Sequence, residues 1–342
     1  MDAVASASDS CVRNARGEWT PANSVKATPL FEWPPRPFRW LKWLLSYPGF
    51  LWPWNGIYLL ITILIWRYLQ PPVSHCVELK AGWMGLLFLR NLGLAWAVYG
   101  GWHLLLYIFK LQGTERKYDI RWPSRNDPKF LFHNQTLDNI FWSCASGVTI
   151  WTAYEVLYFW ALANKKIPYV DWRVHPVYCL VWMCAIPFWR DIHFYFVHRL
   201  IHWGPLYRWA HSVHHRNTNP GPWSGLSMHP IEHLLYFSSV LIHFVVPSHP
   251  VHFLFNSEQT GAFAPATGHH GFEKPLAEKT LPSGSYFHYV HHRIFTVNFG
   301  GEELPLDRWF GTYRRYLSGD AETKPAAAAP QGAAACPAKD QP

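Results

Sequence analysis

The sequence predicts an all-α protein, a polytopic bundle of helices embedded in a membrane. Three observations lead to this prediction: apolar blocks recur along the chain, aromatic residues reach 18% with 21 Trp, and charged residues fall to 15%. Ordinary domains use more charge and much less Trp, whereas membrane proteins place Trp at both interfaces. A soluble all-α protein with very hydrophobic helices is the alternative, but three near-continuous apolar blocks are difficult to bury in one small core.

The predicted elements begin with a tail. Residues 1–35 are polar, without the apolar core of a signal peptide, and we expect them to be disordered. Residues 37–45 alternate basic and bulky apolar side chains, which favours a helix in the membrane interface. Apolar blocks follow at about 50–69, 82–110, 139–163, 176–190 and 234–255.

The first three blocks reach the length of about twenty residues that a spanning helix needs. We therefore expect residues 36–145 to form the N-terminal transmembrane helices. Arg90 interrupts the second block, which is either one long helix with a buried charge or a short hairpin. Pro247 and Pro250 break the fifth block. Residues 318–342, rich in Ala and Pro, are expected to form a disordered tail.

Charge and cysteine usage exclude several classes of protein. The net charge is +8, but the basic residues lie near the ends of apolar blocks, which suits anionic lipid head groups better than nucleic acid. The six cysteines form no CxxC pair, which argues against a zinc ribbon and against a disulfide framework. The twenty histidines are the main anomaly of the composition.

Histidines are concentrated in three motifs, an HxxxH at 198–202 and an HxxHH at both 211–215 and 288–292. In a helix these spacings direct the rings of each motif toward one side. Imidazole ligates Fe, Zn, Cu and Ni, and eight rings exceed the needs of one tetrahedral zinc. The motifs therefore predict a cap that holds a dimetal centre, with the candidate ligands His198, His202, His211, His214, His215, His288, His291 and His292.

Two acidic residues are candidates for a supporting role. Neutral imidazoles leave two metal ions with a strongly positive charge, so nearby carboxylates are expected to orient the rings and offset that charge. Asp191 lies seven residues before His198, close to the same helical stripe, and Glu232 lies downstream of the second motif. We expect Asp191 and Glu232 to fill this role.

The motifs and their surroundings resemble the sterol desaturase/fatty acid hydroxylase superfamily. The resemblance runs from about residue 147 to 316. Its features are the three histidine motifs in this order, the first two close together, and four further segments: Asp191 with the aromatic run 194–196, HPIE at 229–232, HHGF at 269–272 and DRWFGT at 307–312.

The resemblance implies a catalytic domain at 146–317 with two Fe ions, O2 as oxidant, and electrons from NAD(P)H through a reductase or cytochrome b5-type donor. The implied reaction is hydroxylation or desaturation of a sterol, sphingolipid or fatty acyl chain. The resemblance adds His269 to the ligands, with His270 as the alternative. It makes His229 a further candidate, against a plain helix start, and His233 is expected to pack or to orient a ligand.

The implied setting is a multi-pass membrane protein, in the endoplasmic reticulum of a eukaryote or the inner membrane of a bacterium. Basic residues around the motifs place the cap on the cytosolic side by the positive-inside tendency. They suit an acidic electron donor, although a solvated basic face is the plainer reading. These residues are Arg199, Arg208, Arg216, Lys274, Lys279, Arg293, Arg308, Arg314 and Arg315.

Three rival functions remain. A membrane acyl-chain desaturase also has three histidine motifs, but its first two lie further apart than the nine residues between His202 and His211. A metal transporter places ligands within its spanning helices, whereas these motifs lie outside the longest apolar blocks. An inactive scaffold is the third, although every motif is intact. The sequence leaves the substrate open.

Overall fold

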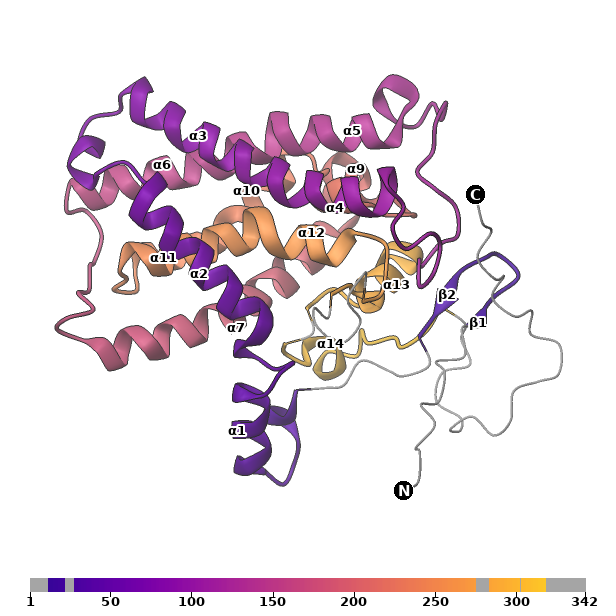
Figure 1. The fold of residues 1–342 in the computed structure, drawn as a ribbon, viewed down its shortest axis with the longest axis horizontal. Helices are drawn as coiled ribbons and strands as arrows, with labels where there is room; N and C mark the ends of the chain where they lie inside the picture. The colour runs from indigo at the N-terminus through magenta and orange to yellow at the C-terminus, as the bar shows by residue number, and fades with distance from the viewer. Residues whose placement is uncertain (1–11, 22–27, 275–282, 302, 318–342) are drawn as a thin grey trace.

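The computed structural model describes residues 12–21, 28–274, 283–301 and 303–317. Within these ranges the chain is mostly helical, and its two short strands, β1 Val12–Arg13 and β2 Trp19–Thr20, pair as one antiparallel hairpin (Figure 1). The helices are α1 Pro37–Leu45, α2 Gly56–Leu64, α3 Ala81–Ala95, α4 Gly101–His103, α5 Gln135–Phe141, α6 Thr149–Ala163, α7 Pro176–Ile201, α8 Gly204–Leu206, α9 Ser212–His215, α10 Pro230–Phe237, α11 Pro250–Glu258, α12 Ala264–His269, α13 Tyr286–Ile294 and α14 Leu306–Trp309.

Short 3-10 and π-helical turns extend or join these helices. The 3-10 turns are Pro29–Phe31, Val73–Cys76, Leu131–His133, Pro222–Leu226 and Ser238–Phe244. The π-helical turns are Leu51–Asn55, Ile65–Leu69, Trp96–Gly100, Leu104–Ile108, Trp142–Val148, Tyr207–His211 and Gln259–Phe263.

Most helices cross the bundle in alternating directions. α2 is followed by α3–α4, α5–α6 by α7, and α10 by α11–α12, and the later member of each pair ends toward the side where α9 and α13 lie (Figure 1). α5–α6 and α7 lie at opposite edges of the bundle, with α10–α12 between them. Packing between α3 and α6, between α2 and α11, and between α7 and α11 holds the helices together. The chain thus carries the ends of three returning segments to one end of the bundle.

Local sequence sets where several of these helices begin. Asn134 caps α5 because its side chain accepts hydrogen bonds from the backbone N–H groups of Thr136 and Leu137. Ser285 caps α13 in the same way, from the N–H of His288. Proline at the first position starts α7, α10 and α11, where no N–H is needed.

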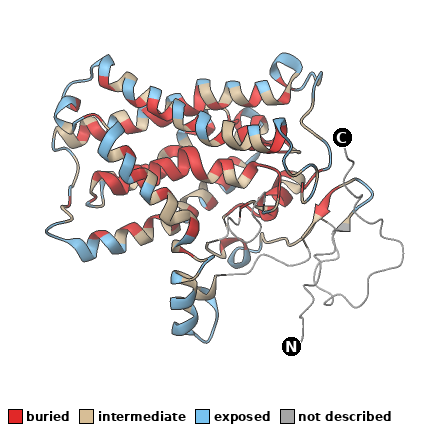
Figure 2. Cartoon of the chain, viewed as in Figure 1, coloured by how far each residue is buried: buried red, intermediate tan, exposed pale blue. Residues whose placement is uncertain are grey.

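The centre of the bundle is α11, all of whose residues are buried, whereas α1 buries none (Figure 2). The largest core cluster gathers side chains from each of these pairs of segments, including Tyr58, Tyr99, Trp151 and Phe263. Tyr58 and Phe263 stack with their ring centroids 4.3 Å apart. Aromatic side chains thus pack the core of the bundle, which accounts for part of the chain's unusual aromatic content.

Among the described residues, one helical segment, Ala81–Ile108, has the length and apolar composition needed to cross a membrane. The two other blocks predicted to span do not meet that test, so the polytopic bundle stays a prediction. Arg90 lies within the continuous segment, buried against Glu155 on α6 and Asn91, which decides for the long helix with a buried charge. Pro247 and Pro250 do separate two helices, as predicted.

The predicted N-terminal tail requires a correction. Residues 1–11 and 22–27 lie outside the described residues, as does the predicted C-terminal tail. Residues 12–21, however, form the β1–β2 hairpin, in which Glu18 and Trp19 are buried. The hairpin is ordered because it pairs with a distant segment of the chain. The local composition of its polar residues does not reveal this pairing.

Candidate metal centre

All nine histidines predicted from the motifs and from the HHGF segment gather at one end of the bundle. They form two groups whose ligand nitrogens lie within 4.8 Å of one another. The first group is His198, His202, His211, His215 and His291, and the second is His214, His269, His288 and His292.

Helical periodicity explains the composition of the two groups. His211 and His215 lie four residues apart and enter the first group together, while His214, rotated by about 100° from His215, enters the second. On α13 the same arrangement is reversed, because His291 crosses alone to the first group. Each HxxHH motif therefore supplies rings to both groups. This differs from the prediction made from spacing alone, that all the rings of one motif point toward one side.

Three rings are held by backbone carbonyl groups through their Nδ1 atoms. His198 bonds the carbonyl oxygen of Phe299 at 2.6 Å, and His291 bonds that of Val297 at 2.7 Å. His269 bonds its own helix at the carbonyl of Pro265, at 2.9 Å. Since a carbonyl oxygen accepts, the Nδ1 atom carries the proton, and the opposite Nε2 atom presents a lone pair to the centre of the group.

The Nε2 atoms converge at distances that favour a cation between them. Nε2 of His211 lies 2.9 Å from that of His202, and Nε2 of His288 lies 2.9 Å from that of His269. Lone pairs directed at one another repel unless a proton or a metal ion lies between them. The donor set therefore fits two metal ions, and imidazole is a ligand that suits iron.

Burial keeps these imidazoles in the neutral form that ligation requires. It lowers the pKa of His198 and of His269 to about 4, and together with the neighbouring His198 it lowers the pKa of His202 to about 2. Burial likewise holds the pKa values of the other six well below the usual range; these are His211, His214, His215, His288, His291 and His292.

Glu232 lies where a ring-orienting residue was expected. Its Oε1 accepts the hydrogen bond of His211 Nδ1 at 2.7 Å, and both side chains are buried. Its Oε2 has no hydrogen-bond partner in the described part of the chain. Burial raises the pKa of this carboxyl well above its usual range. A metal ion bound nearby would lower this pKa again, because its positive charge favours the ionised carboxylate.

Asp191 influences the rings indirectly, through the backbone of a loop. It accepts hydrogen bonds from the backbone N–H groups of Gly301 and Leu304, at 2.7 and 2.6 Å. Those bonds fix the loop that carries the Phe299 carbonyl, the acceptor for His198. The predicted supporting role is therefore exerted through the loop and not through a ring N–H.

The sequence did not single out Asp307 as a functional residue, although DRWFGT was recognised as a motif. Asp307 accepts hydrogen bonds from the N–H groups of Phe299 and Gly300, both at 2.8 Å. It therefore shares with Asp191 the positioning of the loop against His198. The Asp at the start of the DRWFGT motif was the available signal.

The structure does not bring His229 into either group. Its ring caps α10 by accepting from the N–H of Ile231 at 3.2 Å. His270 bonds the hydroxyl of Ser283 and is also outside both groups, so His269 is the residue that joins the centre. His233 contacts Ser146 and the Leu226 carbonyl, which is a packing role.

Four other histidines bond parts of the fold away from the two groups. His193 bonds Ser238, His243 bonds Ser248, and His252 bonds the carbonyl of Cys179. His249 caps α11 from the N–H of Val251.

A cavity of about 330 Å³ adjoins the two groups. Its wall includes histidines of both groups, namely His198, His211, His214, His269 and His288. The rest of the wall is largely apolar, with Trp54, Phe194, Met228 and Tyr236, and charged side chains enter it at Arg190, Asp191, Glu232 and Glu303. A substrate in this cavity would meet both groups of rings.

The fold and the site together define a helical protein with two adjacent all-histidine sites that open on an apolar cavity. The model of the fatty acid hydroxylase family matches residues 183–312, which contain all nine histidines. This segment belongs to the sterol desaturase/fatty acid hydroxylase superfamily, as the resemblance of the motifs predicted.

Three relatives illustrate the relationship. The chain is 27% identical to a Delta(7)-sterol 5(6)-desaturase of Candida glabrata, over 64% of this chain and 60% of that protein. It is 26% identical to a Delta(7)-sterol-C5(6)-desaturase of Nicotiana tabacum (53% and 65%) and 30% identical to methylsterol monooxygenase 1 of Gallus gallus (45% and 53%). The chain thus spans about six tenths of the length of such relatives. No solved structure matches it.

Proposed function

We propose that this protein is a membrane-bound oxidoreductase that uses two iron ions, O2 and reducing equivalents to hydroxylate or desaturate a lipid. The observation that carries the proposal is the placement of two histidine groups on one apolar cavity. A metal store or transporter needs ligands and a path for ions, but it has no need for an apolar cavity of this size beside them.

Each group would hold one ion, through five imidazoles in the first group and four in the second. When bound, the irons supply the redox chemistry that activates O2 against an unreactive C–H bond. The chain's own contribution is to fix the rings through Glu232 and the loop at 297–304, to hold the lipid carbon beside them, and to exclude water.

The substrate we propose is a sterol or another lipid with a bulky apolar body. Support comes from the relatives, whose names identify desaturases and a monooxygenase of sterols, and from the aromatic wall of the cavity. Along α7, Arg190 and His198 both line the cavity and are eight residues apart, about 12 Å along the helix axis. A polar group of the lipid near Arg190 would leave its apolar body extending toward the rings.

Both reactions need an electron donor. Hydroxylation consumes O2, two electrons and two protons to give an alcohol and one water, and desaturation consumes the same to give an alkene and two waters. We propose that the electrons come from NAD(P)H through a reductase or a cytochrome b5-type protein. Arg199 and Arg208 are exposed near the first two motifs and offer a basic surface for an acidic donor; Lys279, counted in the same basic set, lies outside the described residues.

The membrane setting is supported by the candidate spanning segment and by apolar side chains on the outer faces of other helices. Leu180 and Val181 of α7 are 60% and 63% exposed, and Leu60 of α2 is 57% exposed. Exposed apolar faces of this extent indicate contact with lipid or with another protein. We propose a multi-pass arrangement with the histidines on the cytosolic side, in the endoplasmic reticulum of a eukaryote or the inner membrane of a bacterium.

The test is lipid profiling of cells with and without the gene, paired with metal analysis of the purified protein. The proposal expects a lipid that gains a hydroxyl group or a double bond only when the gene is present, and about two irons per chain. A single zinc per chain with unchanged lipids would overturn it.

A further inference from the structure

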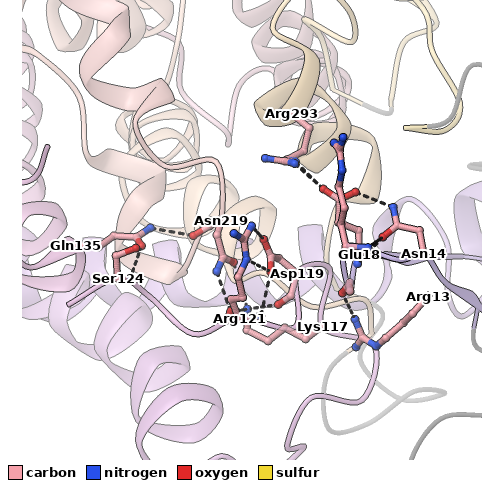
Figure 3. Close-up of polar contacts among 12 residues, drawn as sticks. Arg13, Asn14, Glu18, Lys117, Asp119, Arg121, Ser124, Gln135, Asn219 and Arg293 are labelled. Carbon is pink, nitrogen blue, oxygen red and sulfur yellow. Dashed lines mark hydrogen bonds and ion pairs between the residues drawn. The ribbon is translucent and has the colours of Figure 1, made fainter. Parts of the chain in front are cut away.

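Outside the family segment, the N-terminal hairpin contacts the helix that carries the third histidine motif. Arg293, next to His292 on α13, donates to the same oxygen of Glu18 from Nε at 2.8 Å and from Nη2 at 2.6 Å. Asn14 donates to the other carboxylate oxygen at 2.7 Å. Figure 3 shows Glu18 between these two partners.

The two faces of α13 have different partners. His288, His291 and His292 point to the metal groups, while Tyr286, Tyr289 and Arg293 recur at the spacing of the opposite stripe. Trp19 packs against Tyr286 at 6.4 Å, edge to face, and the Thr20 hydroxyl lies 3.2 Å from that of Tyr286. The hairpin therefore covers the outer face of the helix whose inner face supplies three ligands.

A second line of contacts joins the hairpin to the segment after α12. The N–H of Trp19 donates to the carbonyl of Tyr118, and the N–H of Ile120 donates to that of Gly17. On the other side of this strand-like segment, the N–H of Tyr118 donates to the carbonyl of Gly271, two residues beyond His269. The segments around Trp19, Tyr118 and Gly271 thus lie side by side, and the last of them follows a fourth ligand, His269.

The polar network continues toward the second motif. Buried Lys117 donates to the carbonyls of Asp119 and Arg121 and to the side chain of Asn219. Gln135 at the start of α5 donates to the carbonyl of Asn219 (Figure 3). The segment beneath the hairpin is therefore anchored on the chain that follows His215.

We propose that Glu18 is a positioning residue for the metal centre, acting through Arg293, and that the β1–β2 hairpin is a strap that holds α13 in place. This inference rests on the proposed metal site. Because α13 supplies ligands to both groups, loosening it affects both ions, whereas a residue that holds one ring affects one. Arg293 lies next to the ligand His292 and is paired with Glu18 from outside the centre. Residues that hold ligands in place in this way support metal binding in other proteins.

The experiment measures the release of bound Fe(II) or Co(II) to a chelator from the purified full-length protein. Glu18→Gln removes the charge and keeps the size. The strap predicts that this variant releases both ions about tenfold faster, the lower end of the effect of residues that support ligands. The melting temperature of the metal-free protein is expected to stay within a few degrees. The double variant Glu18→Gln/Arg293→Gln should release no faster than Arg293→Gln alone, because the two residues act as one unit.

Glu32→Gln is the matched control, since Glu32 forms an exposed ion pair of similar length, 2.9 Å, with Arg39, and this pair makes no described hydrogen bond to α13. It should leave release unchanged. The proposal is overturned if Glu18→Gln releases metal at the parent rate, if only one ion is affected, or if faster release merely follows a lowered melting temperature. Hydrogen exchange of residues 286–294 in the metal-free protein, expected to rise in Glu18→Gln, tests the strap even where the parent binds metal other than iron.

Discussion

Nδ1 of His211 donates to Oε1 of Glu232 over 2.7 Å, and this bond links the second histidine motif to α10. Because the proton is held on Nδ1, the Nε2 atom of His211 is free to face the first histidine group. A carboxylate acceptor also increases the basicity of the ring as a ligand.

Glu232→Gln should weaken the ion of the first group and spare that of the second. Loss of the carboxylate is expected to cost roughly tenfold in affinity for that ion, seen as biphasic metal loss in a chelator titration. Glu32→Gln is the control, since Glu32 forms an exposed ion pair with Arg39 and does not line the cavity. Equal weakening of both ions would contradict this role for Glu232.

His214→Ala should abolish lipid oxidation and remove one ion, because His214 contributes to the second group. His229→Ala is the matched comparison. It should keep both ions and lose roughly 1 kcal/mol of stability with the cap of α10. Metal analysis and lipid profiling of the two variants check this, and a fully metallated, active His214→Ala protein would refute the assignment.

The metal-free protein should lose stability as the pH falls. Burial lowers the pKa of His198 and His269 to about 4, below the 6.5 of an unfolded histidine. Between these values the unfolded chain binds more protons, so the free energy of unfolding decreases as pH falls from about 6.5 toward 4. Six carboxyls whose pKa values are raised by burial act in the opposite direction, but the nine imidazoles outnumber them; these carboxyls are Asp138, Asp191, Glu232, Glu258, Glu273 and Asp307.

Melting temperatures of the metal-free protein at pH 7 and pH 5 measure this effect, with a lower value expected at pH 5. Bound metal should reduce the difference at moderate acidity, because the ion competes with protons for the same nitrogens. An unchanged melting temperature without metal would show that the imidazoles are not buried as described.

Arg90→Met should destabilise the bundle strongly. It leaves the carboxylate of Glu155 buried without its ion-pair partner, a change that costs about 3–5 kcal/mol in comparable sites. The double variant Arg90→Met/Glu155→Leu should recover much of the loss, because no uncompensated charge remains. Thermal unfolding in detergent checks both, and a double variant less stable than Arg90→Met would contradict the pairing.

Much of the candidate centre could be predicted because the ligands lie in short motifs with helical spacing. His198 and His202 need only one continuous helix to face the same way, and α7 provides it. The role of Asp191 could not be derived in this way, because it depends on a loop more than 100 residues later in the chain. The order of residues 12–21, within the predicted tail, was missed for the same reason, since Trp19 is ordered by contact with Tyr118 and Tyr286.

The sequence by itself indicated eight histidines of the candidate centre through their motifs, and it indicated that the chain is helical and strongly apolar. The family resemblance added His269 with His270 as the alternative, and the structure decided for His269. Only the tertiary structure decided how the ligands divide, with His214 and His291 each leaving its own motif for the opposite group. The physical reason is that helical periodicity fixes the direction of a ring relative to its own helix. Which ring it meets depends on how α7, α9, α12 and α13 pack, through contacts between residues far apart in the chain.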